Sequence, residues 1–119
     1  MGKFVIRQTA TGYKFDLKAS NGESIATSEV YKTHAACEKG AMSVAKYAPA
    51  AHFADLTEGA TGNNPKFELY QDRAGEFRFR LRSRNGKIIA ISEGYKSKSA
   101  CENGIKSVRA NTVEAEIVV

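Results

Sequence analysis

A chain of 119 residues, 42% hydrophobic and 26% charged, has an ordinary globular composition and room for one modest core. No apolar run approaches the ~20 residues of a membrane span, and the N-terminal residues lack the hydrophobic region of a secretory signal. We therefore expect a cytoplasmic protein with no membrane association. Cys37 and Cys101 are the two cysteines and form no Cys-x-x-Cys motif, which argues against a disulfide scaffold and against a zinc site.

The formal net charge of +5 is a weak indication of an anionic partner. The excess is local. Residues 1–63 carry 7 basic and 6 acidic side chains, a net of +1, whereas residues 64–119 carry 11 basic and 7 acidic ones, a net of +4. Any surface that attracts anions is therefore expected in the C-terminal half.

The first elements in chain order are three short strands. Phe4–Gln8 is followed by a turn region at Gly12, and residues 13–17 then alternate apolar and polar side chains, as a half-buried strand does. Asn21-Gly22 is the favoured pair for a type I′ hairpin turn, in which both central residues need positive φ. A third strand is expected over Ser24–Ser28.

The spacing of the apolar residues then changes to that of a helix. Cys37, Gly40/Ala41 and Val44 fall on one helix face, Thr33 is the N-cap candidate, and Pro49 ends the helical region. An apolar stretch, His52–Leu56, closes this part of the chain, and the Gly-, Asn- and Thr-rich residues 57–65 read as a linker.

Residues 66–119 repeat this order. Strands are expected at Phe67–Gln71, over residues 77–81 and at Ile88–Ser92. A helix follows with Cys101, Gly104/Ile105 and Val108 on its apolar face, and residues 115–119 form the last strand. Ser97 is the N-cap equivalent to Thr33, and Ser99-x-x-Glu102 is a rival capping box.

A shift of 64 positions superimposes the two copies with 16 identities over residues 13–45. The identical residues are Phe15, Leu17, Asn21, Gly22, Ile25, Ala26, Ser28, Glu29, Tyr31, Lys32, Ala36, Cys37, Glu38, Gly40, Ser43 and Val44. Chance does not produce this match, and internal repeats define the architecture. We predict one domain, 1–119, made of copy one (1–56), the linker (57–65) and copy two (66–119).

Each copy reads β-β-β-α-β. One helix covers only one face of a three-stranded sheet, and about 55 residues make a marginal domain. We therefore predict an α+β fold in which the two copies form one pseudo-two-fold antiparallel sheet with both helices on the same face. Because both copies are in one chain, a monomer is expected.

The residues Asn85-Gly86-Lys87 through Lys98, followed by residues 104–108, resemble the YegP-like family of uncharacterised bacterial proteins. The resemblance covers both copies, and copy one is more divergent: it has Thr33-His34 at the positions of Ser97-Lys98. The resemblance implies two β3-α-β units in one sheet with exchanged C-terminal strands, and implies that single-repeat members build the same body as a homodimer. It implies no activity.

The most prominent candidate site is the strand at residues 76–84. Phe77, Phe79 and Leu81 point to one side. The other side carries four arginines, Arg78, Arg80, Arg82 and Arg84, to which copy one adds Lys14 and Lys18. If the helices cover the apolar side, these residues line the open sheet face, where they can contact phosphates and stack on bases. Tyr70 and Ile88 are expected on the same face.

The alternative interpretation of this basic stripe is a solvated face whose arginines pair with Glu68, Glu76 or Asp16 across the strands. We favour this alternative, because a basic stripe is common and the aromatic signature of RNA-binding sheets is missing.

A second candidate lies where the third strand leads into the helix. Tyr31-Lys32 and Tyr95-Lys96 precede the two helix N-termini, whose amides can hold a small anion. Capping of the helices and packing of the tyrosine rings explain these residues better.

No catalytic motif, cofactor-binding motif or metal-ligand spacing is present, so no cofactor or metal is expected and an enzymatic activity is unsupported. The sequence thus favours a non-enzymatic binding module with nucleic acid as the leading ligand. The alternatives are a protein-interaction module, a small-anion-binding module that uses the helix N-termini, and a hydrolase at the seam between copies.

Overall fold

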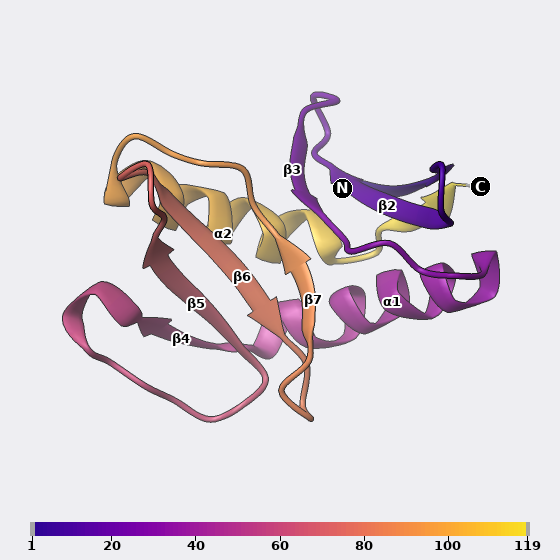
Figure 1. Ribbon diagram of the computed structural model, residues 1–119. Coiled ribbons are helices and arrows are strands. Elements are labelled where there is room, and N and C mark those ends of the chain that lie inside the picture. The colour runs from indigo at the N-terminus through magenta and orange to yellow at the C-terminus, as the bar shows by residue number, and fades with distance from the viewer. Residues whose placement is uncertain (1, 119) are drawn as a thin grey trace.

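The computed structural model describes residues 2–118, so Val119, expected at the end of the last strand, lies outside the described residues. Copy one comprises strands β1 (Lys3–Gln8), β2 (Tyr13–Lys18) and β3 (Ser24–Thr27), helix α1 (His34–Tyr47) and strand β4 (His52–Asp55). Copy two comprises β5 (Lys66–Gln71), β6 (Phe77–Arg82), β7 (Ile88–Ile91), α2 (Lys98–Thr112) and β8 (Glu116–Val118). The short 3₁₀ turns η1 (Ala48–Ala50) and η2 (Leu56–Glu58) flank β4. The predicted β-β-β-α-β order is confirmed in both copies (Figure 1).

All eight strands form one sheet in the order β4-β5-β6-β7-β3-β2-β1-β8. The pseudo-two-fold axis passes between β3 and β7, which pair only at Thr27 and Ile91. The last strand of each copy joins the sheet of the other copy, β4 beside β5 and β8 beside β1, so the C-terminal strands are exchanged.

These two outer pairings are parallel, so the sheet is mixed, whereas we expected it to be antiparallel throughout. The hairpins force β1–β2–β3 and β5–β6–β7 to run antiparallel. The chain reaches β4 and β8 through a helix instead, and a helical connection allows parallel pairing.

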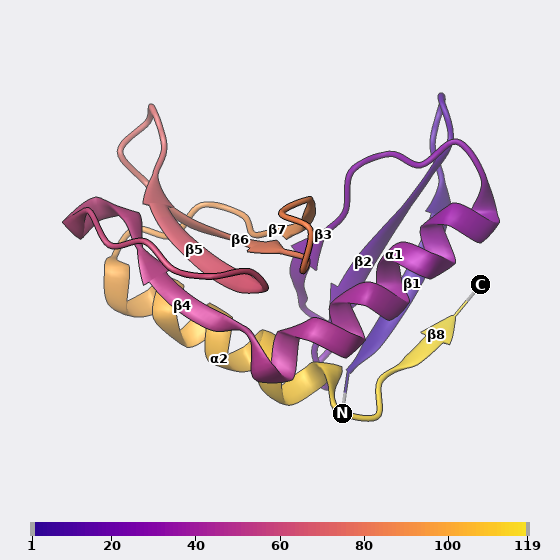
Figure 2. The ribbon, with the colours of Figure 1, turned by 90° about the horizontal axis from the view of Figure 1, so that it is seen from below.

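Both helices lie on one face of the sheet, as predicted (Figure 2). Helix α1 packs against β1 and β2 of its own copy and against β7 of the other, and α2 packs against β5, β6 and β3. Each helix therefore spans the seam, and neither copy has a core independent of the other. No helix among the described residues is long and apolar enough to span a membrane.

The core lies between the helices and the sheet. Four fully buried phenylalanines form two matching edge-to-face pairs, Phe4 with Phe15 and Phe67 with Phe79, at ring-centroid distances of 5.5 and 5.9 Å. Phe15 and Phe79 occupy positions that the strand alternation assigned to the covered face, and Phe4 and Phe67 lie on the same face opposite Leu17 and Leu81. Cys37 and Cys101 are free, buried thiols of the same core, as expected.

The Asn-Gly hairpins differ from the prediction. Gly22 and Gly86 adopt positive φ, +86° and +87°, whereas neither asparagine does, so these turns are not type I′. Gly22 N donates to the Ala19 carbonyl, and Asn21 Oδ1 accepts from Glu23 N, which closes a longer loop with one left-handed residue. Three-residue hairpin loops commonly combine a type I turn with a glycine of this kind.

Two helix glycines leave room for tyrosine rings to pack closely against the helices. Tyr95 stacks on Phe79, with centroids 6.3 Å apart, and a Cβ added at Gly104 would approach the Tyr95 hydroxyl to 2.5 Å and Phe79 Cε2 to 3.0 Å. Gly40 has the same relation to Tyr31 in copy one. The glycines are therefore a packing requirement of the tyrosines, as we expected of a close approach to the sheet.

We expect Gly104→Ala to lower the free energy of unfolding by about 1–3 kcal/mol, because the new methyl group overpacks a fixed ring pair. A glycine in an unobstructed helix would gain about 1 kcal/mol from the same change. Urea denaturation measures the difference, with Asn103→Ala at the exposed neighbouring position as the control. Stabilisation by Gly104→Ala would contradict the assigned packing.

Candidate functional site

Strand register assembles the basic stripe on the uncovered face. Across β5 and β6, Lys66 faces Arg82, Glu68 faces Arg80 and Tyr70 faces Arg78. Directly opposed residues share a face, and Phe67, Leu69, Phe79 and Leu81 occupy the covered one. Tyr70 therefore lies on the open face, as predicted, and so does Ile88, which pairs with Arg82.

Copy one contributes to the same face through β1 and β2, where Lys14 pairs with Arg7 and Lys18 with Lys3. The open face thus gathers basic side chains from four strands. They are Lys3, Arg7, Lys14, Lys18, Lys66, Arg78, Arg80 and Arg82. Its acidic side chains by the same register, with the Asp72 turn added, are Asp16, Glu68, Asp72 and Glu116.

Glu68 is the centre of the largest charge cluster. Its side chain is only 7% exposed, and its Oε1 accepts from the Nε atoms of Arg80 at 2.7 Å and Arg82 at 2.6 Å, while Lys66 Nζ lies 3.3 Å from Oε2. Burial alone would raise the pKa of this carboxyl, but the hydrogen bonds and charges of the two arginines outweigh burial and lower the pKa to about 2. Glu68 is therefore ionised at neutral pH and compensates part of the stripe.

Arg78 is also paired, although with a different carboxylate from those we considered. Its Nε donates to Asp72 Oδ2 at 2.7 Å, and its Nη1 donates to the Ser92 carbonyl. Asp16 pairs with Arg7 of β1 at 2.8 Å. The expected cross-strand pairing of the stripe is thus confirmed for Glu68, whereas Asp72 takes the role that we gave to Glu76.

The pairing leaves donors available. A guanidinium carries five N–H donors, and the hydrogen bonds among the described residues use one on Arg80 and two each on Arg78 and Arg82. The three side chains are 34%, 25% and 26% exposed, so these arginines are only partly exposed on the open face. A carboxylate holds each guanidinium in place, while part of that guanidinium still faces solvent.

The open face is hollowed at the seam between the copies. Because β3 and β7 pair at a single position, a depression of about 550 Å³ remains beside them. Arg7, Lys14 and Arg78 line it from both copies. Asp16, Glu29 and Glu93 line it as well, so its charge is balanced.

Arg84 does not belong to the stripe, which corrects our prediction. Strand β6 ends at Arg82, and the turn that follows, closed by the bond from Gly86 N to the Ser83 carbonyl, ends the alternation of side chains. Arg84 instead lines a groove beside α1, on the side of the sheet that carries the helices.

The helix N-termini are occupied by their own caps. Thr33 Oγ1 accepts from Ala36 N and Ser97 Oγ from Ala100 N, each at 3.1 Å, which confirms both predicted N-caps and places Ser97, not Ser99, at that position. Lys32 and Lys96 are exposed just before them.

Tyr31 and Tyr95 stack on the core phenylalanines Phe15 and Phe79. Burial raises the pKa of both phenols, which keeps them neutral at neutral pH. The residues of this second candidate site therefore lie together, and a local structural role accounts for the tyrosines and the caps.

The remaining reactive groups have structural surroundings. Burial raises the pKa of Cys37 and raises that of Cys101 to about 11, so both thiols are poor nucleophiles. Asp55 Oδ2, at the end of β4, lies 3.0 Å from Lys98 Nζ, and this ion pair joins the two copies. No group of three or more potential metal ligands occurs among the described residues.

These features define a class of protein: a tandem-repeat α+β module with one mixed eight-stranded sheet, an uncovered basic face and two helices behind it. The model of a domain of unknown function, DUF1508, matches the chain twice, at residues 9–55 and 72–118. The chain belongs to this family.

Relatives with the length of two copies and relatives with the length of one copy are both similar to this chain. The UPF0339 protein YegP of Yersinia pestis is 35% identical over 98% of this chain and 94% of its own length. A UPF0339 protein of Methanosarcina acetivorans is 57% identical over 54 residues, which are 45% of this chain but 93% of that protein, so it has the length of a single copy.

Two solution NMR structures share the fold over 98% of the chain. They are the protein of unknown function yegP from E. coli, with a TM-score of 0.79, 32% identity and 90% of that chain covered, and UPF0339 protein SO3888 from Shewanella oneidensis, with a TM-score of 0.80, 30% identity and 89% covered.

Proposed function

We propose that this protein is a non-enzymatic binding module of the cytoplasm whose open sheet face binds single-stranded nucleic acid. The observation that carries the proposal is the uncovered face, where eight basic side chains from both copies outnumber six acidic ones, among them Glu29 and Glu93 at the seam. Contacts to phosphates supply most of the affinity in binding of this kind, and they do not depend on sequence.

The ion pairs support the proposal because they orient the arginines. Arg80 packs its guanidinium 4.6 Å from the Tyr70 ring while Glu68 holds its Nε. A guanidinium fixed in this way loses little conformational entropy when its remaining N–H groups meet a phosphate. Tyr70 beside it offers part of an aromatic surface to a base.

We expect short single-stranded RNA or DNA to shift the backbone amide NMR signals of residues 14–18 and 78–82 at low salt. The affinity should fall steeply with added salt, and Lys14→Ser/Lys18→Ser should reduce the log–log salt slope by about 0.7 for each phosphate that the protein no longer neutralises. Neither lysine belongs to the charge cluster around Glu68, so the double variant leaves that cluster intact. Lys46→Ser/Lys106→Ser, exposed on the two helices, removes the same charge and should not change the slope.

Unchanged spectra at low salt, or equal effects of the two double variants, would refute the nucleic-acid proposal.

We also propose that the chain acts as a monomer, because each copy completes the sheet of the other within one chain. Light scattering at micromolar concentration tests this.

A further inference from the structure

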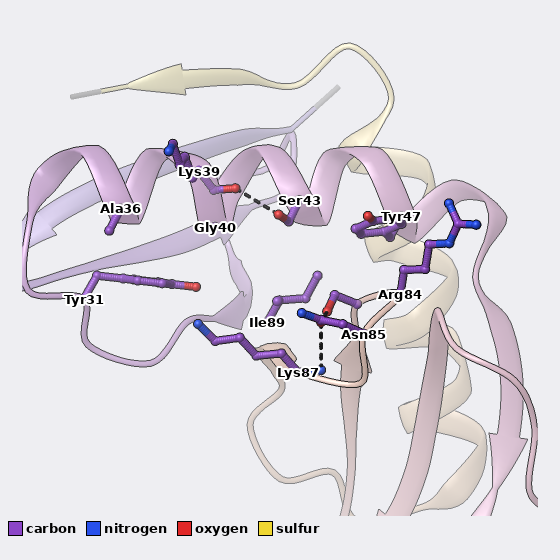
Figure 3. Close-up of a pocket in the computed structure, with 11 residues that line it drawn as sticks. Tyr31, Ala36, Lys39, Gly40, Ser43, Tyr47, Arg84, Asn85, Lys87 and Ile89 are labelled. Atoms are coloured by element: carbon purple, nitrogen blue, oxygen red, sulfur yellow. Dashed lines mark hydrogen bonds between the residues drawn. The ribbon is translucent and has the colours of Figure 1, made fainter.

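A second concave surface lies on the side of the sheet that carries the helices. This groove, about 620 Å³ in volume, separates α1 of copy one from the β6–β7 hairpin of copy two. We call it the inter-copy groove, bounded by Tyr31, Lys39 and Tyr47 from copy one and Arg84, Lys87 and Ile89 from copy two. Figure 3 shows the two tyrosines at opposite ends with Ile89 between them.

The groove is positively charged. Lys39, Arg84 and Lys87 line it, and none of its eleven lining residues, all within the described part of the chain, is acidic. One carboxylate, that of Glu29, lies 3.5 Å from Lys87 Nζ. Both side chains of this pair are about half exposed, at 54% and 51%, so water screens the pair strongly. The charges of the groove are therefore compensated far less than those of the sheet stripe.

The walls also offer apolar and aromatic surface. Ile89 is buried in the floor, and the partly buried rings of Tyr31 and Tyr47 flank it. Ser43 and Asn85 add hydrogen-bonding groups from opposite walls. A concave site of a few hundred Å³ with aromatic walls and a few convergent polar groups is the usual form of a small-molecule site.

The pseudo-symmetric position in the other half of the molecule is built differently. The shift of 64 keeps Tyr, Gly, Ser, Asn and Ile at equivalent places, but Lys39, Tyr47, Arg84 and Lys87 become Asn103, Asn111, Ser20 and Glu23. These changes turn three positive charges into one negative charge. Asn111 Oδ1 also accepts from Ser20 N at 3.3 Å, which ties α2 to the β2–β3 hairpin across that position. The duplicated scaffold alone therefore does not explain the positive charge of the inter-copy groove.

We propose that the inter-copy groove binds a small organic phosphate with a planar body, the chemistry of a nucleoside monophosphate. Lys39, Arg84 and Lys87 hold the phosphate by charge-assisted hydrogen bonds, and the surface formed by Tyr31, Ile89 and Tyr47 receives the planar part. Neither half of the site suffices alone, because phosphate by itself makes no use of the rings and a neutral planar molecule makes no use of the cations. The site shares no residue with the lysines and arginines that carry the proposed nucleic-acid interface.

An amide-resolved NMR titration of the full chain with AMP, adenosine and inorganic phosphate at low salt tests the proposal. We expect AMP to shift signals at residues 39–47 and 84–89 and to bind at least ~10-fold more tightly than either fragment. Adenosine or phosphate binding as tightly as AMP would overturn the two-part ligand. No AMP-dependent shift in the groove would overturn the site itself.

Copy two provides the test variants. Lys39→Asn and Arg84→Ser each place the copy-two residue in the groove and should weaken AMP binding about tenfold, since each removes one charged donor. Lys106→Asn, an exposed lysine of α2, removes the same charge outside the groove and should leave binding unchanged. Equal weakening by all three variants would mean that net charge alone attracts AMP and would refute the proposal.

A short oligoadenylate distinguishes a free nucleotide from a strand. Shifts in the groove with AMP, and none there with the oligonucleotide, support a free small ligand. Shifts in the groove with the oligonucleotide and none with AMP would overturn it. Because the open face has different reporter residues, 14–18 and 78–82, failure at one surface is distinguishable from failure at the other.

Discussion

Phe79→Ala should lower the free energy of unfolding by about 3–5 kcal/mol, the largest effect that we expect of a single core substitution. The ring is fully buried, meets Phe67 edge-to-face at 5.9 Å, and stacks against Tyr95 at 6.3 Å. Removing it leaves a cavity that Tyr95 cannot fill without leaving its position over Gly104. Urea denaturation monitored by circular dichroism measures the loss.

Phe53→Ala is the control for this prediction. Phe53 stands on edge strand β4 with 46% of its surface exposed, so its removal should have an effect of about 1 kcal/mol or less. A near-neutral Phe79→Ala would mean that the two faces of β6 are exchanged. In that case the arginines, and not the phenylalanines, would be covered by α2.

Glu68→Gln should destabilise the protein by about 2–3 kcal/mol at neutral pH. The carboxyl titrates near 4.5 in the ordinary case and near 2 in the folded protein, because its hydrogen bonds with Arg80 and Arg82 favour the ionised form. A folded-state pKa below that of the unfolded chain stabilises the fold above the unfolded value, by on the order of 3 kcal/mol here. This contribution is fully present above pH 4.5 and is lost as the pH falls through about 2.

The measurement compares the unfolding free energies of the wild type and Glu68→Gln at pH 7, 4 and 2.5. The difference should shrink as the pH falls, because the wild-type carboxyl becomes protonated and then resembles the amide. Other carboxylates titrate equally in both proteins and cancel from the comparison. A difference that does not change with pH would show that Glu68 acts through packing and not through charge.

Much of the fold follows from local sequence. The period-two pattern at residues 77–81 identified the buried face of β6, and Thr33 and Ser97 cap their helices because a hydroxyl there meets a free amide three residues on. The 64-residue shift predicted one merged sheet, because one copy of about 55 residues would be a marginal domain by itself. The exchange of terminal strands came from the resemblance to the family and not from periodicity.

What the sequence missed depends on contacts between distant segments or on details of turns. Arg84 was assigned to the sheet stripe because alternation was extended two residues beyond the end of β6. Asp72, the partner of Arg78, lies in the β5–β6 turn, where no alternation rule applies. Lys39 and Lys87 are 48 positions apart, and only the packing of α1 against the opposite hairpin brings them to one groove.

Strand exchange within one polypeptide has an evolutionary consequence. A two-fold homodimer of a single-copy chain presents every surface twice, so any substitution that opens or charges one cleft does the same to its mate. Here β4 and β8 join two copies of different sequence in one chain, so a substitution in one copy leaves the equivalent position of the other unchanged. One cleft can therefore acquire Arg84 and Lys87 while the other carries the hydrogen bond between Ser20 and Asn111. Carrying both copies in one chain frees the two clefts from exact symmetry and lets one of them differ from the other.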